Sequence, residues 1–161
     1  MKGYEIYFQK DKAGSPVKNS LTDFDIVCVE FPFQLYPETK ALISDDWADE
    51  HGEDAFFPEK LTLKAYDLEA KLCYVGNSAY DDIVSFLDYL RGEDGNGTSL
   101  KIYNSYTKMG RQKLYLKSVD DDIFHSDGSE DIVLFSVTFR VTDPKTKITP
   151  VIMGGNVTGL A

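Results

Sequence analysis

The segment Ile132 to Val141, IVLFSVTFRV, is the clearest strand signal in this chain of 161 residues. Apolar and more polar side chains alternate along it, and the set expected to face inward is Val133, Phe135, Val137, Phe139 and Val141. A period of two places one set of side chains on the covered face of a sheet and the other towards water. The segment therefore predicts a long, half-buried antiparallel strand, which Asp143-Pro144 should end.

Further strand signals lie on both sides of this segment. They are Phe24 to Phe33, Leu61 to Tyr74, the segments around Leu100 to Ile102 and Leu114 to Val119, and a short one from Ile148. Within Leu61 to Tyr74 the apolar side chains move from odd to even positions near Tyr66, which predicts a bulge or a switch between sheets. A strongly curved sheet is expected. The acidic segment Asp120 to Asp131 is interpreted as a solvated hairpin tip.

One segment has the period of a helix. Its apolar stripe is Ile83, Phe86, Leu87 and Leu90, widened by Val84. Ser78 suits the N-cap and Gly92 can end the helix. The expected fold class is mainly β with one helix (α+β): a curved antiparallel β-sandwich or barrel flanked by a single amphipathic helix. Residues 1–161 form one domain, and 1–23 and 150–161 are candidate terminal arms.

Charge and hydropathy exclude several classes of partner. The chain has 17 lysines and arginines and 27 acids, a net charge of −10. It has no basic stripe that could displace counterions from phosphates. Binding to DNA or RNA is therefore not expected. No apolar run of about 18 residues could span a membrane. The start, MKGYEIYFQKDKAG, lacks the apolar core of a signal peptide, so a bacterial or viral cytosolic product is expected.

The residues of common chemical sites lack the required spacing. His51 and His125 are the only histidines, and neither HExxH nor CxxC occurs, so no zinc site is predicted. Cys28 and Cys73 lie in strand-like segments and are interpreted as reduced core thiols. There is no GxSxG elbow and no phosphate-binding loop. The sequence therefore predicts no catalytic residue, no cofactor-binding residue and no metal ligand.

Residues Ser44 to Pro58, SDDWADEHGEDAFFP, combine acidic and aromatic side chains. The segment holds six carboxylates (Asp45, Asp46, Asp49, Glu50, Glu53 and Asp54) and the only tryptophan. If Gly52 is aligned with the glycine of an EF-hand loop, Pro58 takes the place of the bidentate glutamate, so the spacing fails. We interpret the segment as a solvated loop anchored by Trp47 and Phe56 or Phe57. These three aromatic residues are the candidate contact loop.

The order of parts resembles a known family. A long curved β run, the helix from Ser78 to Arg91, the turn GEDGNG, two strands and the final FSVTFRVTDP resemble the tail-tube and distal-tail group of bacteriophage and prophage proteins. The segment DDWADEHGEDAFFP also looks like a stretch of uncharacterised prophage tail proteins of gut bacteria. The resemblance covers roughly residues 24–145.

This resemblance implies a structural subunit without enzymatic activity. Members of the group assemble into rings, often hexamers, whose partners are further copies and other tail proteins. The implied location is the bacterial cytoplasm during assembly and then the virion tail. An acidic ring lumen would repel DNA and let it slide through. Distal-tail proteins often carry a second, carbohydrate-binding-like domain for which this chain is too short, so a tube, terminator or ring-adaptor role is equally open.

Two other functions stay open at this point. The first is a binding module, in which Trp47, Phe56 and Phe57 contact a carbohydrate or peptide and the nearby acids hold Ca²⁺. The second is an enzyme of unrecognised type, which would need carboxylates that converge in a deep pocket.

Overall fold

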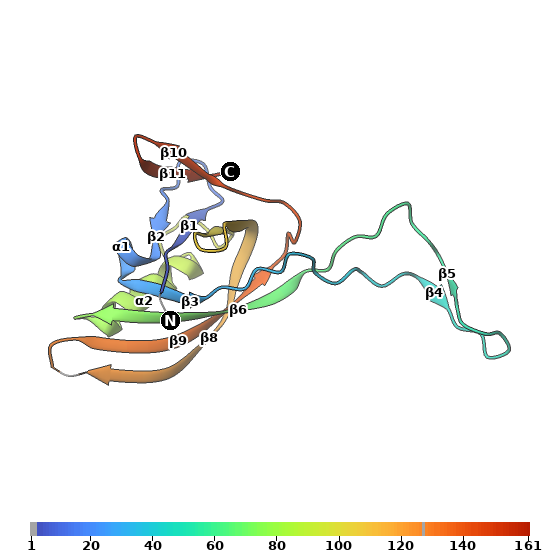
Figure 1. The fold of residues 1–161 in the computed structure, drawn as a ribbon, viewed down its shortest axis with the longest axis horizontal. Coiled ribbons are helices and arrows are strands. Elements are labelled where there is room, and N and C mark those ends of the chain that lie inside the picture. The colour runs from blue at the N-terminus through green and yellow to red at the C-terminus, as the bar shows by residue number, and fades with distance from the viewer. Residues whose placement is uncertain (1–2, 127) are drawn as a thin grey trace.

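The computed structural model describes residues 3–126 and 128–161, and side chains outside 121–127. Its main element is one antiparallel sheet of seven strands in the order β2-β1-β7-β8-β9-β6-β3 (Figure 1). The strands are β1 (Ile6–Lys10), β2 (Lys18–Asn19), β3 (Ile26–Glu30), β6 (Tyr66–Gly76), β7 (Leu100–Asn104), β8 (Met109–Ser126) and β9 (Asp131–Val141). The sheet curves around helix α2 (Ala79–Arg91). The expectation of a mainly β chain with one main helix is confirmed.

The curved sheet does not close into a barrel, so that alternative is wrong. An isolated bridge joins the residues before β1 to the edge strand β3, and in it the backbone N–H and C=O of Tyr4 bond those of Cys28 at 2.9 and 2.8 Å. A ladder between β1 and β3 cannot continue from this bridge, because the same edge of β1 pairs with β2 at Tyr7 and Phe8. The curved sheet therefore touches its edge strand β3 at one residue pair and stays open.

Strand β9 lies in the middle of the curved half of the sheet. It pairs with β6 from Asp131 opposite Gly76 to Val141 opposite Tyr66, and with β8 along its other edge. The inward-facing residues expected from the sequence are all buried: Val133, Phe135, Val137, Phe139 and Val141. The predicted half-buried strand is confirmed.

Strand β8 is longer than the sequence predicted. It was expected to end at Val119, yet it continues to Ser126 and pairs with β9, with Asp121 opposite Phe135. Acidic residues do not end an antiparallel strand when one face of the sheet is open to water. The predicted loop from Asp120 to Asp131 is therefore wrong over most of its length. The side chain of His125 lies outside the described residues.

The helix predicted between Ser78 and Gly92 is confirmed as α2, with these two residues at its cap positions. Phe86 and Leu90 are fully buried, and the Phe86 ring contacts the rings of Phe8 and Phe24 at centroid distances of 5.6 and 5.1 Å. Val84 does not widen the buried stripe, because it is 37% exposed. Ser78 occupies the N-cap position but makes no capping hydrogen bond with its side chain.

The N-terminal segment, a candidate arm, contributes to the core. Ile6 and Phe8 of β1 are fully buried, and β1 lies inside the sheet beside β7. Helix α1 (Ser20–Phe24) follows, and the side chain of Asn19 accepts hydrogen bonds from its first N–H groups. The strand predicted from Phe24 to Phe33 is consequently shorter, since Phe24 ends this helix and β3 spans Ile26–Glu30.

The strand predicted from Leu61 to Tyr74 begins later than expected. In β6 the even-numbered residues Tyr66, Leu68, Ala70, Leu72 and Tyr74 are buried, whereas Leu61 is 56% exposed and lies outside any strand. No bulge links the odd and even apolar sets. The change of register marks the point where an exposed segment enters the sheet.

The C-terminal residues form a hairpin instead of a single strand and a free end. Strands β10 (Pro150–Met153) and β11 (Asn156–Leu160) are joined by Gly154 and Gly155, whose φ angles are 59° and 81°. Two glycines at positive φ are typical of a tight hairpin turn. Ile148 and Leu160 pack against Tyr103 of β7 in a second, small apolar cluster. The hairpin is therefore attached to the sheet.

The two cysteines differ in their surroundings. Cys28 faces inward and is fully buried, and this burial raises its pKa to about 12. Cys73 has an odd number in β6, whose even-numbered residues face the core, and it is half-buried on the opposite face. Both are free thiols. The interpretation as a core thiol is confirmed for Cys28 and wrong for Cys73.

The Asp143 carboxylate should make the free energy of unfolding depend on pH. Partial burial acts to raise its pKa, but hydrogen bonds from Gln112 and from the backbone of Thr146 and Lys145 outweigh it and hold the pKa at about 2. A depressed pKa stabilises the fold above pH ~4 and ceases to do so as the pH falls through ~2. Asp143→Asn should lower the free energy of unfolding by about 1 kcal/mol at pH 6 and by less near pH 2.

Urea unfolding at the two pH values checks this prediction. Glu59→Gln is the matched control, because Glu59 is an exposed residue far along the chain from Asp143. Equal losses for Asp143→Asn at both pH values would contradict the assignment.

Candidate functional site

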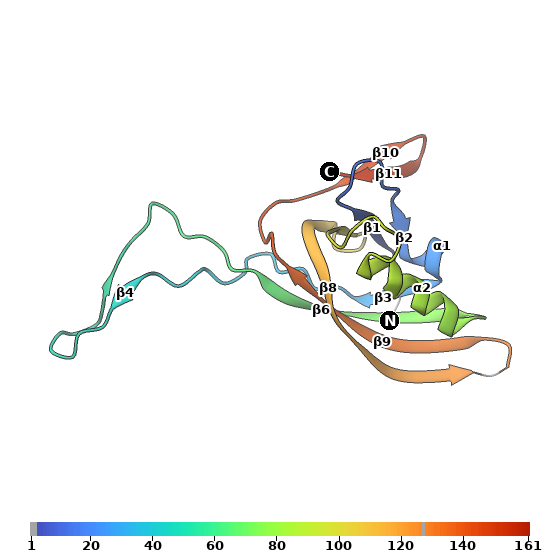
Figure 2. The same ribbon diagram turned by 180° about the vertical axis from the view of Figure 1, so that it is seen from behind.

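Residues 34–65, here called the protrusion, leave the body after Phe33 and return at Tyr66 (Figures 1 and 2). The two legs of the protrusion are held by a few backbone bonds. Lys64 N–H donates to Glu38 C=O, and Phe56 N–H to Ile43 C=O, each at 2.8 Å. Near the tip, β4 (Ser44–Asp45) pairs with β5 (Asp54–Ala55). The protrusion is thus a long, sparsely paired hairpin.

The protrusion exposes large apolar side chains. Trp47, Phe56 and Phe57 are 52%, 69% and 77% exposed. Leu35, Tyr36, Ile43 and Leu61 are exposed as well. The prediction that the aromatic residues anchor this segment is wrong, because the protrusion extends away from the apolar core (Figure 2). Burying one such side chain contributes about 1.5–3 kcal/mol, so together these residues form a strong candidate contact surface.

The same segment is acidic. Residues 34–65 hold eight acids and three lysines, a net charge of −5 and half that of the chain. His51 is exposed near the tip. Among residues 3–120 and 128–161, no three histidine, cysteine or acidic side chains come together in a way that could hold a metal ion. The acidic tip therefore offers dispersed charge next to apolar surface.

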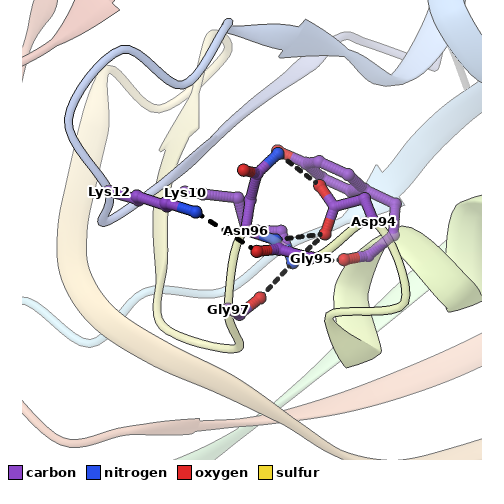
Figure 3. A network of polar contacts seen from close by, with 7 residues as sticks. Lys10, Lys12, Asp94, Gly95, Asn96 and Gly97 are labelled. Carbon is purple, nitrogen blue, oxygen red and sulfur yellow. Dashed lines mark hydrogen bonds and ion pairs between the residues drawn. The ribbon is translucent and has the colours of Figure 1, made fainter.

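A second polar site surrounds Lys10, which is only 2% exposed (Figure 3). Its ammonium donates hydrogen bonds to the carbonyl oxygens of Tyr89 and Gly97, the latter at 2.6 Å. It also lies 3.7 Å from the Asp94 carboxylate and 4.6 Å from the centre of the Tyr89 ring. Burial lowers the pKa of Lys10, and the neighbouring Asp94 acts against that shift.

This lysine ties the last turn of α2 and the GEDGNG turn to β1. Asn96 N–H donates to the Asp94 carboxylate at 3.2 Å, and the turn needs positive φ at Gly95 and Gly97. A buried ammonium bound to two carbonyl groups and a carboxylate has a structural role. Lys10 was not predicted as a site residue, although a lysine at an inward position of a strand, two residues after Phe8, indicates a buried cation.

A cavity of about 300 Å³ adjoins the Lys10 site. It is lined by Lys10, Pro16, Lys18, Phe24, Tyr89, Asp94 and Asn96. The rings of Phe24 and Tyr89 lie 5.8 Å apart at 39°. The Tyr89 hydroxyl is buried and has no hydrogen-bond partner within the described part of the chain. No local pattern could reveal this cavity, because five parts of the chain line it: β1, β2 with the residues before it, α1, α2 and the GEDGNG turn.

Comparisons with known proteins bear on the fold. No protein-family model matches the chain, and no curated protein matches it either. In the described parts of the chain, no helix is long and apolar enough to cross a membrane. One solved structure that is similar is the crystal structure of SPP1 Dit (gp 19.1), described as a paradigm of the hub adsorption apparatus in phages that infect Gram-positive bacteria.

The alignment with SPP1 Dit has a TM-score of 0.55 and 17% sequence identity. It covers 90% of this chain and 52% of the phage protein, so the chain spans about half the length of that relative. At this identity the likeness concerns the fold. Nearly the whole chain thus has a fold that resembles part of a phage tail hub protein.

Proposed function

We propose that this chain is a non-enzymatic structural subunit of a phage or prophage tail, acting as a tube, distal-tail or ring-adaptor component that assembles into a homo-oligomeric ring. The observation that carries the proposal is the protrusion with its exposed Trp47, Phe56 and Phe57. The likeness of the fold to a phage hub protein supports the same role.

Assembly supplies what the isolated protrusion lacks. A two-stranded hairpin is marginally stable in water by itself, and ordering its residues costs conformational entropy. Contact with a second copy would bury the apolar side chains and offset that cost. An interface of about 1,600 Å² is the usual size for a specific complex, and a protrusion of this length can supply much of it. Its carboxylates would lie at the polar rim.

Removal of the Trp47 side chain should weaken the ring. Trp47→Ala is expected to raise the protein concentration needed for assembly by about tenfold or more, because a large aromatic at the centre of an interface contributes about 2 kcal/mol or more. Size-exclusion chromatography with light scattering measures the change, and Trp47→Phe, which keeps an aromatic ring, is the matched control. Unimpaired assembly of Trp47→Ala, or a strict monomer at high concentration of the unaltered protein, would contradict the proposal.

The fluorescence of Trp47 provides an independent measurement. It is the only tryptophan, so the emission reports this position alone. At 52% exposure the indole is in contact with water in the single chain. Its emission should shift to shorter wavelength and become less accessible to acrylamide as concentration rises through the assembly range. An emission maximum that stays constant through assembly would place Trp47 outside the interface.

A further inference from the structure

We propose that the cavity between β1, α1 and α2 receives the tip of the protrusion of a second copy, with Trp47 against Phe24 and Tyr89 and the tip carboxylates beside Lys18. This inference rests on the proposed function and deepens it, since it names the surface that each protrusion contacts. The tip and the cavity lie on opposite sides of the body of one chain.

The placement of the two surfaces requires that a second copy supplies the tip. The protrusion extends from one side of the body, whereas β2, α1 and α2 lie on the opposite side (Figures 1 and 2). The tip therefore cannot fill the cavity of its own chain. A contact between different surfaces of identical copies is head-to-tail, and such contacts close into rings when the rotation allows it.

The cavity has the walls that an indole needs. The tilted rings of Phe24 and Tyr89 form an aromatic corner, with Pro16 also in the lining. Its volume of about 300 Å³ is at the lower end of the range for ligand pockets, which suits one large side chain more than an extended ligand. Offset or edge-on aromatic contacts add to the free energy of simple burial.

The buried Tyr89 hydroxyl lacks a hydrogen bond that a docked tip would supply. Tyr89 is 7% exposed and its hydroxyl has no partner among the described residues. Buried phenol groups normally form a hydrogen bond, and an unsatisfied one is unfavourable. This oxygen is closed off in the single chain, so an indole N–H can donate to it, or a carboxylate accept its proton, only when the side chains around it shift on docking. The tip of the protrusion carries both groups, in Trp47 and in the six acids around it.

Charge favours the same pairing. The Asp94 carboxylate in the lining is already engaged with Lys10 and Asn96, which leaves the half-buried Lys18 as the remaining cation of the lining. Lys12 lies alongside and donates to the carbonyl oxygen of Gly95 at 3.3 Å. The tip, residues 44–58, has six acids and no lysine or arginine. Complementary charges of this kind raise the rate of association and disfavour other orientations.

Disulfide trapping tests the contact directly. In a Cys73→Ser background, chains that carry Ala48→Cys, which keeps the neighbouring Trp47, are mixed with chains of different length that carry Lys18→Cys, and the mixture is oxidised. Disulfide-linked dimers of the two lengths are expected at concentrations where the protein assembles. Lys147→Cys, at another exposed lysine, is the matched control. Tyr106→Cys tests an alternative acceptor, an apolar cavity of about 430 Å³ lined by Tyr4, Phe31 and Tyr106.

Substitutions in the cavity give a second readout. Lys18→Glu should raise the concentration for half-assembly by about tenfold, whereas Lys147→Glu, with the same change of charge, should alter it by less than about twofold. Tyr89→Phe keeps the ring and removes the hydroxyl, and should weaken assembly by about fivefold with an unchanged wavelength shift per assembled chain. Thermal unfolding of each variant shows whether it is folded.

The outcomes separate this inference from the function on which it rests. If the unaltered protein assembles but Ala48→Cys links to Tyr106→Cys or equally to Lys147→Cys, the cavity assignment is overturned and the ring survives. The same holds if Lys18→Glu and Lys147→Glu weaken assembly equally. If the unaltered protein is a monomer at every concentration, the proposed function itself fails.

Discussion

Removal of the outer protrusion should abolish assembly while the body remains folded. The variant replaces residues 39–63 by Asn-Gly, which joins Glu38 to Lys64. These two residues already share a backbone hydrogen bond of 2.8 Å, and Asn-Gly is the preferred two-residue turn for closing such a pair. We expect the apparent dissociation constant for self-association to rise by more than about 100-fold.

The body should tolerate this excision because the core does not depend on the protrusion. Within the described part of the chain, the main apolar cluster passes from Phe33 to Tyr66 without a member between them. The melting temperature should therefore stay within a few degrees of that of the full chain. Sedimentation velocity and thermal unfolding measure the two effects on the same sample.

A full-length control separates the contact from the length of the segment. In it, the exposed apolar residues of the excised segment become serine: Ile43, Trp47, Phe56, Phe57 and Leu61. This variant should fail to assemble as well, although its backbone is intact. If the excised chain still forms the unaltered oligomer, the protrusion is not the contact surface and the proposed mode of assembly is wrong.

Lys10→Met should cause the largest loss of stability of any single substitution considered. The methionine keeps most of the side-chain volume but leaves the carbonyl groups of Tyr89 and Gly97 and the Asp94 carboxylate without their cation. Removing one member of a buried charged network costs about 3 kcal/mol. For a chain of this size that loss lowers the melting temperature by about 10 °C.

Lys71→Met is the matched control for this prediction. Lys71 forms an ion pair with Glu30 at 3.3 Å, but the two side chains are 59% and 52% exposed, so its loss should cost less than about 1 kcal/mol. Chemical unfolding of both variants under the same conditions gives the comparison. A loss below about 1 kcal/mol for Lys10→Met would show that the network does not hold the GEDGNG turn to β1.

The local periodicity of the sequence was sufficient to predict the strands and the helix that bury one regular face. The alternation in β9 and the stripe of Phe86 and Leu90 in α2 follow from the contact of a strand or helix with one apolar core. The same reasoning failed between Leu61 and Tyr66, where apolar residues belong to an exposed segment. Apolar character predicts that a residue will be buried, and it does not say whether its own chain or another copy buries it.

The two polar sites show a different limit. The acidic and aromatic character of Ser44 to Pro58 was evident in the sequence, and the expectation of a contact loop there stays a prediction. The Lys10 network and the cavity beside it were not foreseen. They combine residues of β1, of β2 and the segment before it, of α1 and α2, and of the GEDGNG turn, and only the folded sheet brings these segments together.

The attachment of the protrusion to the sheet has a mechanical consequence. Its legs continue from β3 and into β6, which are neighbouring antiparallel strands, and β6 pairs along all of its residues, from Tyr66 to Gly76, with β9. A pull on the protrusion is therefore directed along these strands, while the hydrogen bonds between antiparallel strands run across them. Such a load must shear many bonds of the ladder at once instead of unzipping them one by one. A subunit joined to its neighbour in this way can transmit tension while its fold stays intact.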